Sequence, residues 1–408
     1  MEISRLEKDE EVERPVDLGE VTKTVAPIVE DVRKNGDTAV LEYSKRFDDY
    51  KGKIQIQPGD IRKAYTQVDE DTLNAIRKAY ENIKAFHKAQ IPKDINMLLN
   101  GVELGQTARA IESIGIYVPG GKAAYVSTVL MCAAPARVAG VNQIVICTPP
   151  PVSPLVLLAA DICGVSTVYA VGGAQAIAAM AYGTETIPKV DKIVGPGNAY
   201  VAAAKKLVFG DVGIDSIAGP SEVLIIADEQ AEPKTIALEM LAQAEHDENA
   251  LSVLVTTSEK VAKQTVEEVK KRTAECDRKE ILEKSLANSR ILIASSIDDA
   301  IGFSNRFAPE HLVILTKQDI LDRIKSAGSV FIGNYASVAF GDYCSGTNHV
   351  LPTSGSARFQ SGLNLDQFMK KLTWQRIGEG GYRQLSDIAV KLAKSEGLYM
   401  HAKAVEER

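Results

Sequence analysis

The sequence predicts an α/β protein built on parallel β-sheets. From Asn142 onward, short β-branched segments alternate with glycine turns and helical segments, as in QIVICT, TVYAVGG, AQAIAAMAYG, KIVGPG and AYVAAAKKLVF. A second run of the same kind begins near Ala250, and its strand-like segments are LSVLVTT, RILIAS, HLVILT and SVFIGN. Strand, turn and helix repeated in this order is typical of βαβ units, whose strands pair in parallel.

The segments around these two runs are predicted from their periodicity. Apolar residues recur every three or four positions between about Val16 and Gln90, which indicates amphipathic helices. Strands are expected around Glu103 and over Ala110–Tyr117, and the tail from Leu365 to Arg408 is predicted to be helical. Within the runs, helices are expected over 258–273, 297–307 and 318–325, and Ser153 before Pro154 marks a further helix start.

Composition excludes several classes of function. The chain has 408 residues, enough for two domains, and its 45% hydrophobic and 25% charged residues are typical of a globular protein. The net charge of −7 disfavours nucleic acid as a partner. The five cysteines form no CxxC pair, and the acidic N-terminus has no apolar signal region. We therefore expect a cytoplasmic protein that neither crosses a membrane nor binds nucleic acid.

Two short motifs carry residue types suited to metal binding. In QAEH, Gln243 and His246 are three positions apart, so they share one helix face and could hold one metal ion. Spacing alone leaves a plain solvated helix face as the more frequent alternative. The loop GDYCSGTNH, residues 341–349, is rich in turn formers, and its Asp342 could complete the metal site.

Other motifs suggest acid–base or phosphate chemistry. In APEHL, Glu310 and His311 could act as general base and proton relay, although an isolated pair is more often structural. Cys344 could serve as a thiol nucleophile, but nothing beside it in the sequence marks it as activated. The turns GIYVPGG, VGGAQA and GPGNAY could approach a phosphate, yet none matches the GxGxxG dinucleotide fingerprint.

Taken together, the segments resemble the histidinol dehydrogenase family over almost the whole chain from about Val16. The resemblance is carried, in order, by GIYVPGG, STVLMCAAPARVAG, VGGAQAIAAMAYGT, VGPGNAYVAAAK, GPSEVLIIAD, QAEHD, RFAPEHL, GDYCSGTNHVLPTSGSARF and EGLYMHAKAV. It implies two incomplete Rossmann-like domains of the aldehyde-dehydrogenase-like superfold, with a helical N-terminal segment and a helical C-terminal tail. It also implies oxidation of L-histidinol to L-histidine in two steps, each of which reduces one NAD, with one zinc ion per subunit.

The resemblance assigns roles residue by residue. The acid–base pair falls on Glu310 and His311. The zinc ligands fall on Gln243, His246, Asp342 and His401. The NAD contacts fall on Tyr117, Gln175 and Asn198. The substrate contacts fall on Ser221, Gln243, His246, His311, Asp342, Glu396 and His401. His401 is expected to come from the partner subunit of a homodimer.

The resemblance also implies a division into domains. Residues 1–15 form an N-terminal arm, 16–112 and 223–363 form a first α/β domain, and 113–222 form a second, inserted domain on the NAD-binding side. Residues 364–408 form a tail that crosses the dimer.

Three other functions stay open on the sequence alone. A related zinc dehydrogenase could act on another small polyol or on a sulfonated alcohol. A metal-dependent hydrolase could use Glu310 to activate a zinc-bound water, and it would produce no NADH. A non-catalytic binding protein on the same scaffold is disfavoured by the intact pair Glu310 and His311.

Overall fold

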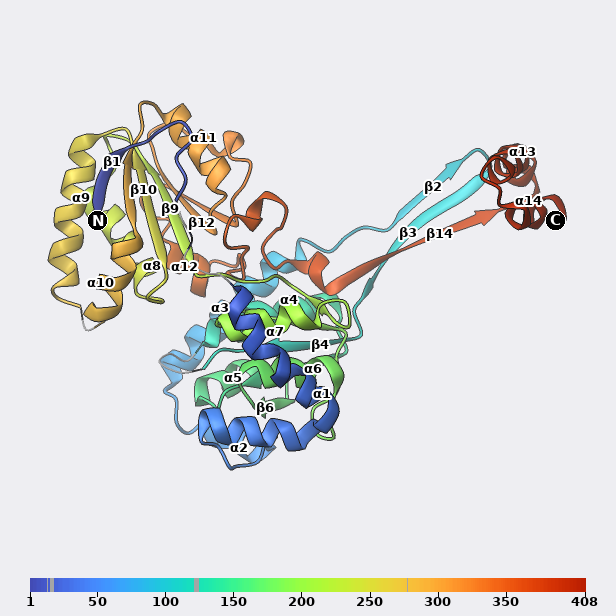
Figure 1. Cartoon of the computed structure of the whole chain (residues 1–408), viewed down its shortest axis with the longest axis horizontal. Helices are drawn as coiled ribbons and strands as arrows, with labels where there is room; N and C mark the ends of the chain where they lie inside the picture. The colour runs from blue at the N-terminus through green and yellow to red at the C-terminus, as the bar shows by residue number, and fades with distance from the viewer. Residues whose placement is uncertain (13, 15–17, 121–124, 277) are drawn as a thin grey trace.

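The protein consists of two α/β bodies and a long arm that projects away from both (Figure 1). This computed structural model describes residues 1–12, 14, 18–120, 125–276 and 278–408. The predicted boundary between residues 15 and 16, and Gly121 of the GIYVPGG turn, lie outside the described residues. Each body is built on a parallel sheet, so the predicted α/β architecture is confirmed.

The first sheet has five parallel strands in the order β6-β5-β4-β7-β8. The strands are β4 (Ser113–Tyr117), β5 (Gln143–Thr148), β6 (Val168–Ala170), β7 (Lys192–Val194) and β8 (Gly213–Ile214). Its connecting helices are α4 (Val126–Ala139), α5 (Pro154–Ile162), α6 (Gly173–Tyr182) and α7 (Ala199–Val208). The chain adds strands on one side of β4 and then on the other, so the order reverses between β4 and β7. Such a switch point opens a crevice at the carboxyl ends of the strands.

The second sheet has six parallel strands in the order β1-β11-β10-β9-β12-β13. The strands are β1 (Glu2–Arg5), β9 (Glu222–Ala227), β10 (Leu251–Thr256), β11 (Arg290–Ile293), β12 (His311–Leu315) and β13 (Ser329–Ile332). Its helices are α8 (Pro233–Ala244), α9 (Glu259–Thr273), α10 (Lys279–Asn288), α11 (Ile297–Phe307) and α12 (Val338–Tyr343). Without β1, the strand order repeats that of the first sheet. The N-terminal residues therefore extend this sheet by one edge strand.

Three helices near the N-terminus cover the five-stranded sheet. Helix α1 (Leu18–Asp48) packs on α6 and α7, α2 (Pro58–Ala64) on α5, and α3 (Glu70–Lys88) on α4. Their apolar faces join the cores of that body, with Val32 and Ile83 fully buried. The division implied by the resemblance instead groups residues 16–112 with residues 223–363, and that division stays a prediction.

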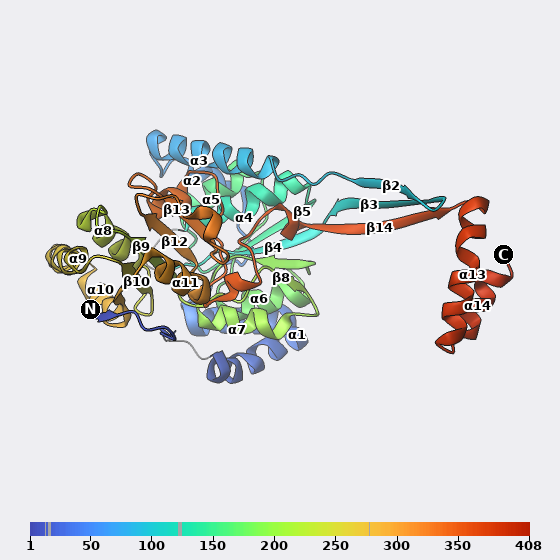
Figure 2. The same cartoon turned by 90° about the horizontal axis from the view of Figure 1, so that it is seen from above.

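The projecting arm is an antiparallel sheet in the order β14-β3-β2. Its strands are β2 (Ile95–Leu99), β3 (Val102–Ala110) and β14 (Met369–Ile377), and α13 (Glu379–Ser395) and α14 (Tyr399–Glu406) form its tip (Figures 1 and 2). The predicted helix over the start of the tail is wrong, because β14 pairs with β3 along its whole length. Trp374 lies opposite Gly105, and a Cβ at Gly105 would come within 2.1 Å of the Trp374 ring.

Two smaller findings complete the fold. The helix expected over 318–325 is only a 3-10 turn, Leu321–Arg323. Among the described helices, none is both long enough and apolar enough to cross a bilayer.

Candidate active site

Glu310 and His311 lie where α11 ends and β12 begins. Ala308 closes the helix in the left-handed region with φ 51°, and Pro309 cannot continue a helix, so the chain turns directly into the strand. His311 is the first residue of β12 and pairs with β9 and β13 on its two sides. Both side chains are only 5% exposed. The motif therefore places an acid and an imidazole at the amino edge of the six-stranded sheet.

The backbone of Glu222, the first residue of β9, orients both side chains. Its N–H donates to Glu310 Oε2 at 2.8 Å, and its carbonyl oxygen accepts from His311 Nδ1 at 3.1 Å. Because Nδ1 carries the proton in this bond, Nε2 is the basic nitrogen of the neutral ring. That nitrogen is buried, lies 3.7 Å from Asp342 Oδ1, and has no hydrogen-bond partner among the described residues.

The carboxyl group of Glu222 is neutralised by Arg14. The Arg14 guanidinium donates to both carboxylate oxygens of Glu222, at 2.7 and 3.2 Å, and to the carbonyl oxygen of Phe307. Arg14 also lies over the Phe307 ring at 4.0 Å from its centroid. This buried ion pair holds the start of β9, and so the backbone that serves Glu310 and His311.

Burial and neighbouring charges raise the pKa values of Glu310 and His311 and lower that of Asp342. Burial raises the pKa of Glu310 to about 7, although the neighbouring His311 opposes the rise. Burial by itself would lower the pKa of His311, but Glu310 and Asp342 outweigh it and raise the pKa to about 9. Burial opposes ionisation of Asp342 as well, yet His311, His349 and His246 hold its pKa below the usual range.

A loop that bridges the two bodies brings Asp342 to this pair. Asp342 is on α12, in the GDYCSGTNH segment of the sequence. Asn348 Nδ2, further along the loop, donates to Met131 O of α4 at 2.7 Å, and Asn82 Nδ2 of α3 donates to Cys344 O at 2.8 Å. The polar site therefore lies between the two bodies rather than inside either one.

The carboxyl edge of the five-stranded sheet holds a second set of polar residues. Tyr117 ends β4, and its phenolic oxygen accepts from the N–H of Gly173 at 3.1 Å, at the start of α6. Asn198 caps α7 by accepting from Tyr200 N and Val201 N, both at 3.1 Å. These groups flank the β4–β7 switch point, where doubly wound sheets bind dinucleotides.

Comparison with known proteins identifies the family to which this chain belongs. A sequence model of the histidinol dehydrogenase family matches residues 12–408. The chain is 50% identical to the histidinol dehydrogenase of Methanocaldococcus jannaschii, with 100% of this chain and 97% of the relative aligned. It is 49% identical to that of Methanosarcina mazei, with 100% and 96% aligned. The chain belongs to the histidinol dehydrogenase family.

The fold agrees with that membership. The crystal structure of histidinol dehydrogenase from Elizabethkingia anophelis superposes with a TM-score of 0.93 at 41% identity, covering 99% of this chain and 96% of that one. The resemblance inferred from the ordered sequence blocks is thus confirmed.

The predicted histidinol dehydrogenase residues fall into three groups in space. Glu310, His311 and Asp342 converge, and the charges of His246 and His349 act on Asp342. Ser221 directly precedes β9 and is half-buried at the same amino edge. Tyr117, Gln175 and Asn198 gather at the other sheet, where Asn198 is exposed while Tyr117 and Gln175 are buried. Glu396 and His401 lie at the tip of the arm, exposed and far from both groups (Figure 2).

The predicted zinc ligands can be tested against the donors present. Gln243 lies on the last turn of α8 and is 4% exposed, and His246 follows two residues after the helix ends. The Gln243 amide nitrogen is buried without a hydrogen-bond partner among the described residues, so the protein does not saturate this amide. The Gln243 amide oxygen, the His246 imidazole and the Asp342 carboxylate are oxygen and nitrogen donors suited to zinc.

The same donor set is incomplete within one chain. Among the residues that the structure describes, no three His, Cys, Asp or Glu side chains are grouped closely enough to hold a metal ion. The predicted set offers only His246 and Asp342 of these types within the bodies, because Gln243 is an amide and His401 is on the arm. Within one chain, the described residues therefore bring together part of the predicted donor set, and His401 is not among them.

Sequence reasoning did not assign His349 to the site. Its Nε2 atom is buried without a hydrogen-bond partner, and its other contact is with the backbone of Ser127 on α4. Burial lowers the pKa of His349, while Asp342 acts in the opposite direction. The available signal was its position in the same loop as Asp342, seven residues further on. By contrast, His87 is a core residue whose Nδ1 bonds to Ile83 O at 2.8 Å.

The raised pKa of Glu310 predicts how Glu310→Gln changes stability with pH. A carboxyl whose pKa is higher in the folded state costs stability as pH rises from its ordinary value of 4.5 to about 7. The variant has no carboxyl at this position, so it does not lose this stability as pH rises. The change also removes the carboxylate that raises the pKa of His311, and this too makes the variant more stable relative to wild type as pH rises. Its melting temperature should therefore rise relative to wild type between pH 5 and pH 8, on the order of a few degrees.

Differential scanning calorimetry across that pH range measures the effect. Glu267→Gln, an exposed position on α9, is the matched control and should follow wild type at every pH. A melting-temperature difference for Glu310→Gln that stays constant with pH would show that Glu310 titrates normally.

Proposed function

We propose that this chain oxidises L-histidinol through L-histidinaldehyde to L-histidine, the last steps of L-histidine biosynthesis, with NAD and one zinc ion per subunit. The observation that carries the proposal is the convergence of Glu310, His311 and Asp342 between the two bodies of a chain from the histidinol dehydrogenase family. Two oxidations require a proton acceptor for an alcohol and a base for a water molecule. The site offers one group suited to each task.

His311, in the neutral form that becomes more abundant as pH rises towards its pKa of about 9, takes the proton of the substrate hydroxyl in the first oxidation. Its Nδ1–H is held by the Glu222 carbonyl, so Nε2 receives the proton. Asp342 stabilises the imidazolium that forms, from 3.7 Å away. This arrangement fixes one tautomer and one ring orientation before the substrate arrives.

Glu310 activates the water that adds to the aldehyde between the two oxidations. A carboxyl with a pKa of about 7 is a far better base than one with an ordinary pKa, and it still ionises near neutral pH. The N–H of Glu222 holds Oε2, which leaves the other carboxylate oxygen to accept the proton of the water. The resulting gem-diol is an alcohol again, so His311 can serve the second oxidation as well.

Zinc and NAD supply what the side chains cannot. When bound, zinc orients the amino alcohol and NAD⁺ accepts hydride. Gln243, His246 and Asp342 would hold the metal, with His401 of the partner subunit as the fourth protein ligand. Tyr117, Gln175 and Asn198 would contact NAD at the carboxyl edge of the five-stranded sheet. Because Tyr117 and Gln175 are buried, Asn198 is the side chain most directly exposed to the cofactor.

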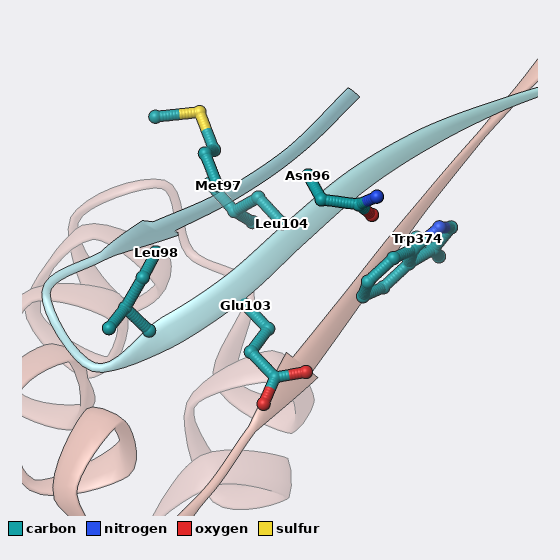
Figure 3. A pocket seen from close by; sticks show the side chains of 6 residues that line it. All are labelled: Asn96, Met97, Leu98, Glu103, Leu104 and Trp374. Carbon is teal, nitrogen blue, oxygen red and sulfur yellow. The ribbon is translucent and has the colours of Figure 1, made fainter. Parts of the chain in front are cut away.

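The arm is the part of the chain suited to joining two subunits. Apolar side chains on its strands are exposed, among them Ile95, Met97 and Leu98, the last at 73%. Met97 and Leu98, together with Asn96, Glu103, Leu104 and Trp374, border a groove of about 440 Å³ on the arm sheet (Figure 3). A surface of this kind is expected to be covered by another protein surface. We propose a homodimer in which this arm carries Glu396 and His401 to the partner subunit's site.

We also propose that the protein is located in the cytoplasm. All five cysteines are free thiols, which is the usual state in a reducing cytoplasm.

We predict that two NADH form per histidinol consumed, and that Glu310→Gln separates the two steps. The variant should lose oxidation of added aldehyde by roughly 10²–10⁴-fold while oxidation of histidinol falls far less, because only the second step needs activated water. Absorbance of NADH under single-turnover conditions measures both. Equal losses in the two half-reactions would contradict the division of roles, and product release from an ester without NADH would favour a hydrolase.

We predict that His246→Ala stays folded but loses its zinc, because the change removes a ligand without touching either sheet. Metal analysis after gel filtration and circular dichroism measure the two properties. Glu248→Ala, an exposed residue of the same turn, is the control and should keep both zinc and activity. Stoichiometric zinc in His246→Ala would show that this residue does not bind the metal.

We predict that His246→Ala and His401→Ala restore activity when they are unfolded and refolded together. In a mixed dimer one site collects both lesions and the other none, so random mixing should recover about a quarter of the wild-type sites. A mass tag on one chain confirms that mixed dimers are present. If mixed dimers form and remain inactive, His401 acts within its own chain.

A further inference from the structure

A buried ion pair holds the two peptide units on either side of Gly195, at the carboxyl end of β7. The N–H of Gly195 donates to Asp215 Oδ2 at 2.7 Å, and Lys205 Nζ donates to the carbonyl oxygen of Gly195 at 3.0 Å. Lys205 and Asp215 also form an ion pair with each other, and their side chains are only 2% and 4% exposed. Both polar groups of Gly195 are thus held by charged side chains.

The turn that begins at Gly195 follows a narrow path. Gly195 has φ +111°, and a Cβ at this position would lie 2.2 Å from Tyr117 O. A Cβ at Gly197 would lie 2.3 Å from a methyl group of Val201. The turn is therefore wedged between the end of β4 and the first turn of α7, at the switch point of the sheet.

The same turn ends in Asn198, which is exposed. Its Oδ1 is used to cap α7, so its Nδ2 amide is the group that can donate to a ligand. Lys205 lies two turns further along α7, on the helix that Asn198 caps. The Lys205–Asp215 ion pair thus holds the turn at Gly195, and the Asn198 cap holds it at the start of α7.

Burial of a lysine and an aspartate is costly, and an apolar pair of similar size would fill the space at least as well. The neighbouring Lys192 does not hold this turn, since its ammonium donates to the side chain and backbone oxygens of Gln367, at 2.6 and 2.8 Å. What the ion pair adds is a fixed orientation of the two peptide units that meet at Gly195. We infer that Lys205 and Asp215 are positioning residues that hold the Gly195–Asn198 turn in the conformation that binds NAD.

This inference rests on the proposed NAD site, and a graded pair of variants tests it. Lys205→Met with Asp215→Asn removes the charges and the hold on the carbonyl but keeps an acceptor for the Gly195 N–H. Lys205→Met with Asp215→Leu removes both holds. The dissociation constant of NADH, measured by nicotinamide fluorescence, should rise severalfold in the first and by about tenfold or more in the second.

Kinetics separate positioning from a merely structural role. The KM for NAD should rise in the same order, while kcat at saturating NAD and the KM for histidinol stay within about twofold, because the acid–base pair is on the other sheet. Lys206→Met, at the exposed neighbouring position, should bind NADH as wild type does. Unchanged NADH affinity in folded double variants, or a fall in kcat alone, overturns the inference.

If the leucine variant fails to fold, the asparagine variant decides alone by its affinity relative to Lys206→Met. Asn198→Ala keeps the two proposals apart. If Asn198→Ala also binds NADH as wild type does, the assigned NAD edge itself is wrong. If Asn198→Ala weakens binding and the double variants do not, only the positioning role fails.

Discussion

The proposed chemistry depends on the backbone of one residue, Glu222, which holds both Glu310 and His311. Its N–H and carbonyl oxygen each serve one member of the acid–base pair, so the spacing between Glu310 and His311 is set by a single strand end. That strand end is itself fixed by the ion pair of the Glu222 carboxylate with Arg14. A buried carboxylate without such a partner would be strongly destabilising beside a second carboxylate. The N-terminal segment thus stabilises the site without contacting the reacting groups.

The two sheets have the same strand order but use opposite edges. The five-stranded sheet presents its carboxyl edge, with Tyr117 and Asn198 at the switch point, as expected for dinucleotide binding. At the corresponding edge of the six-stranded sheet, a hydrogen bond of 2.6 Å from Lys317 N to Asp228 Oδ2 joins the segments that follow β12 and β9. The amino edge of this sheet instead carries Glu310 and His311. In the proposed function, a repeated architecture therefore supplies the cofactor edge in one copy and the acid–base edge in the other.

The sequence predicted what depends on local pattern. The βαβ runs, the Ser153 cap and the polar motifs follow from spacing and turn chemistry over a few residues, and the structure has them. It did not predict β14, because MKKLTWQRI becomes a strand only when β3 is beside it and Gly105 makes room for Trp374. His349 escaped for a related reason. Its place in the same loop as Asp342 was a signal, but its burial beside Asp342 depends on contacts with distant segments such as Ser127 on α4.

Glu396 and His401 lie on the arm, and contacts within one chain do not bring them to the other predicted site residues. Gln243 on α8 and Asp342 on α12 lie in the six-stranded body, whereas His401, the fourth ligand proposed for zinc, lies on the arm. Helices α13 and α14 are held at the tip of a three-stranded sheet, and among their described residues only Gly381 and Ala402 are buried. A helix pair so exposed gains little stability from its own chain. Its exposed Ile388, Leu392 and Met400 are the surface that a second subunit would have to cover, and covering it would bring a histidine and a glutamate with it. Assembly and completion of the site would then be one event.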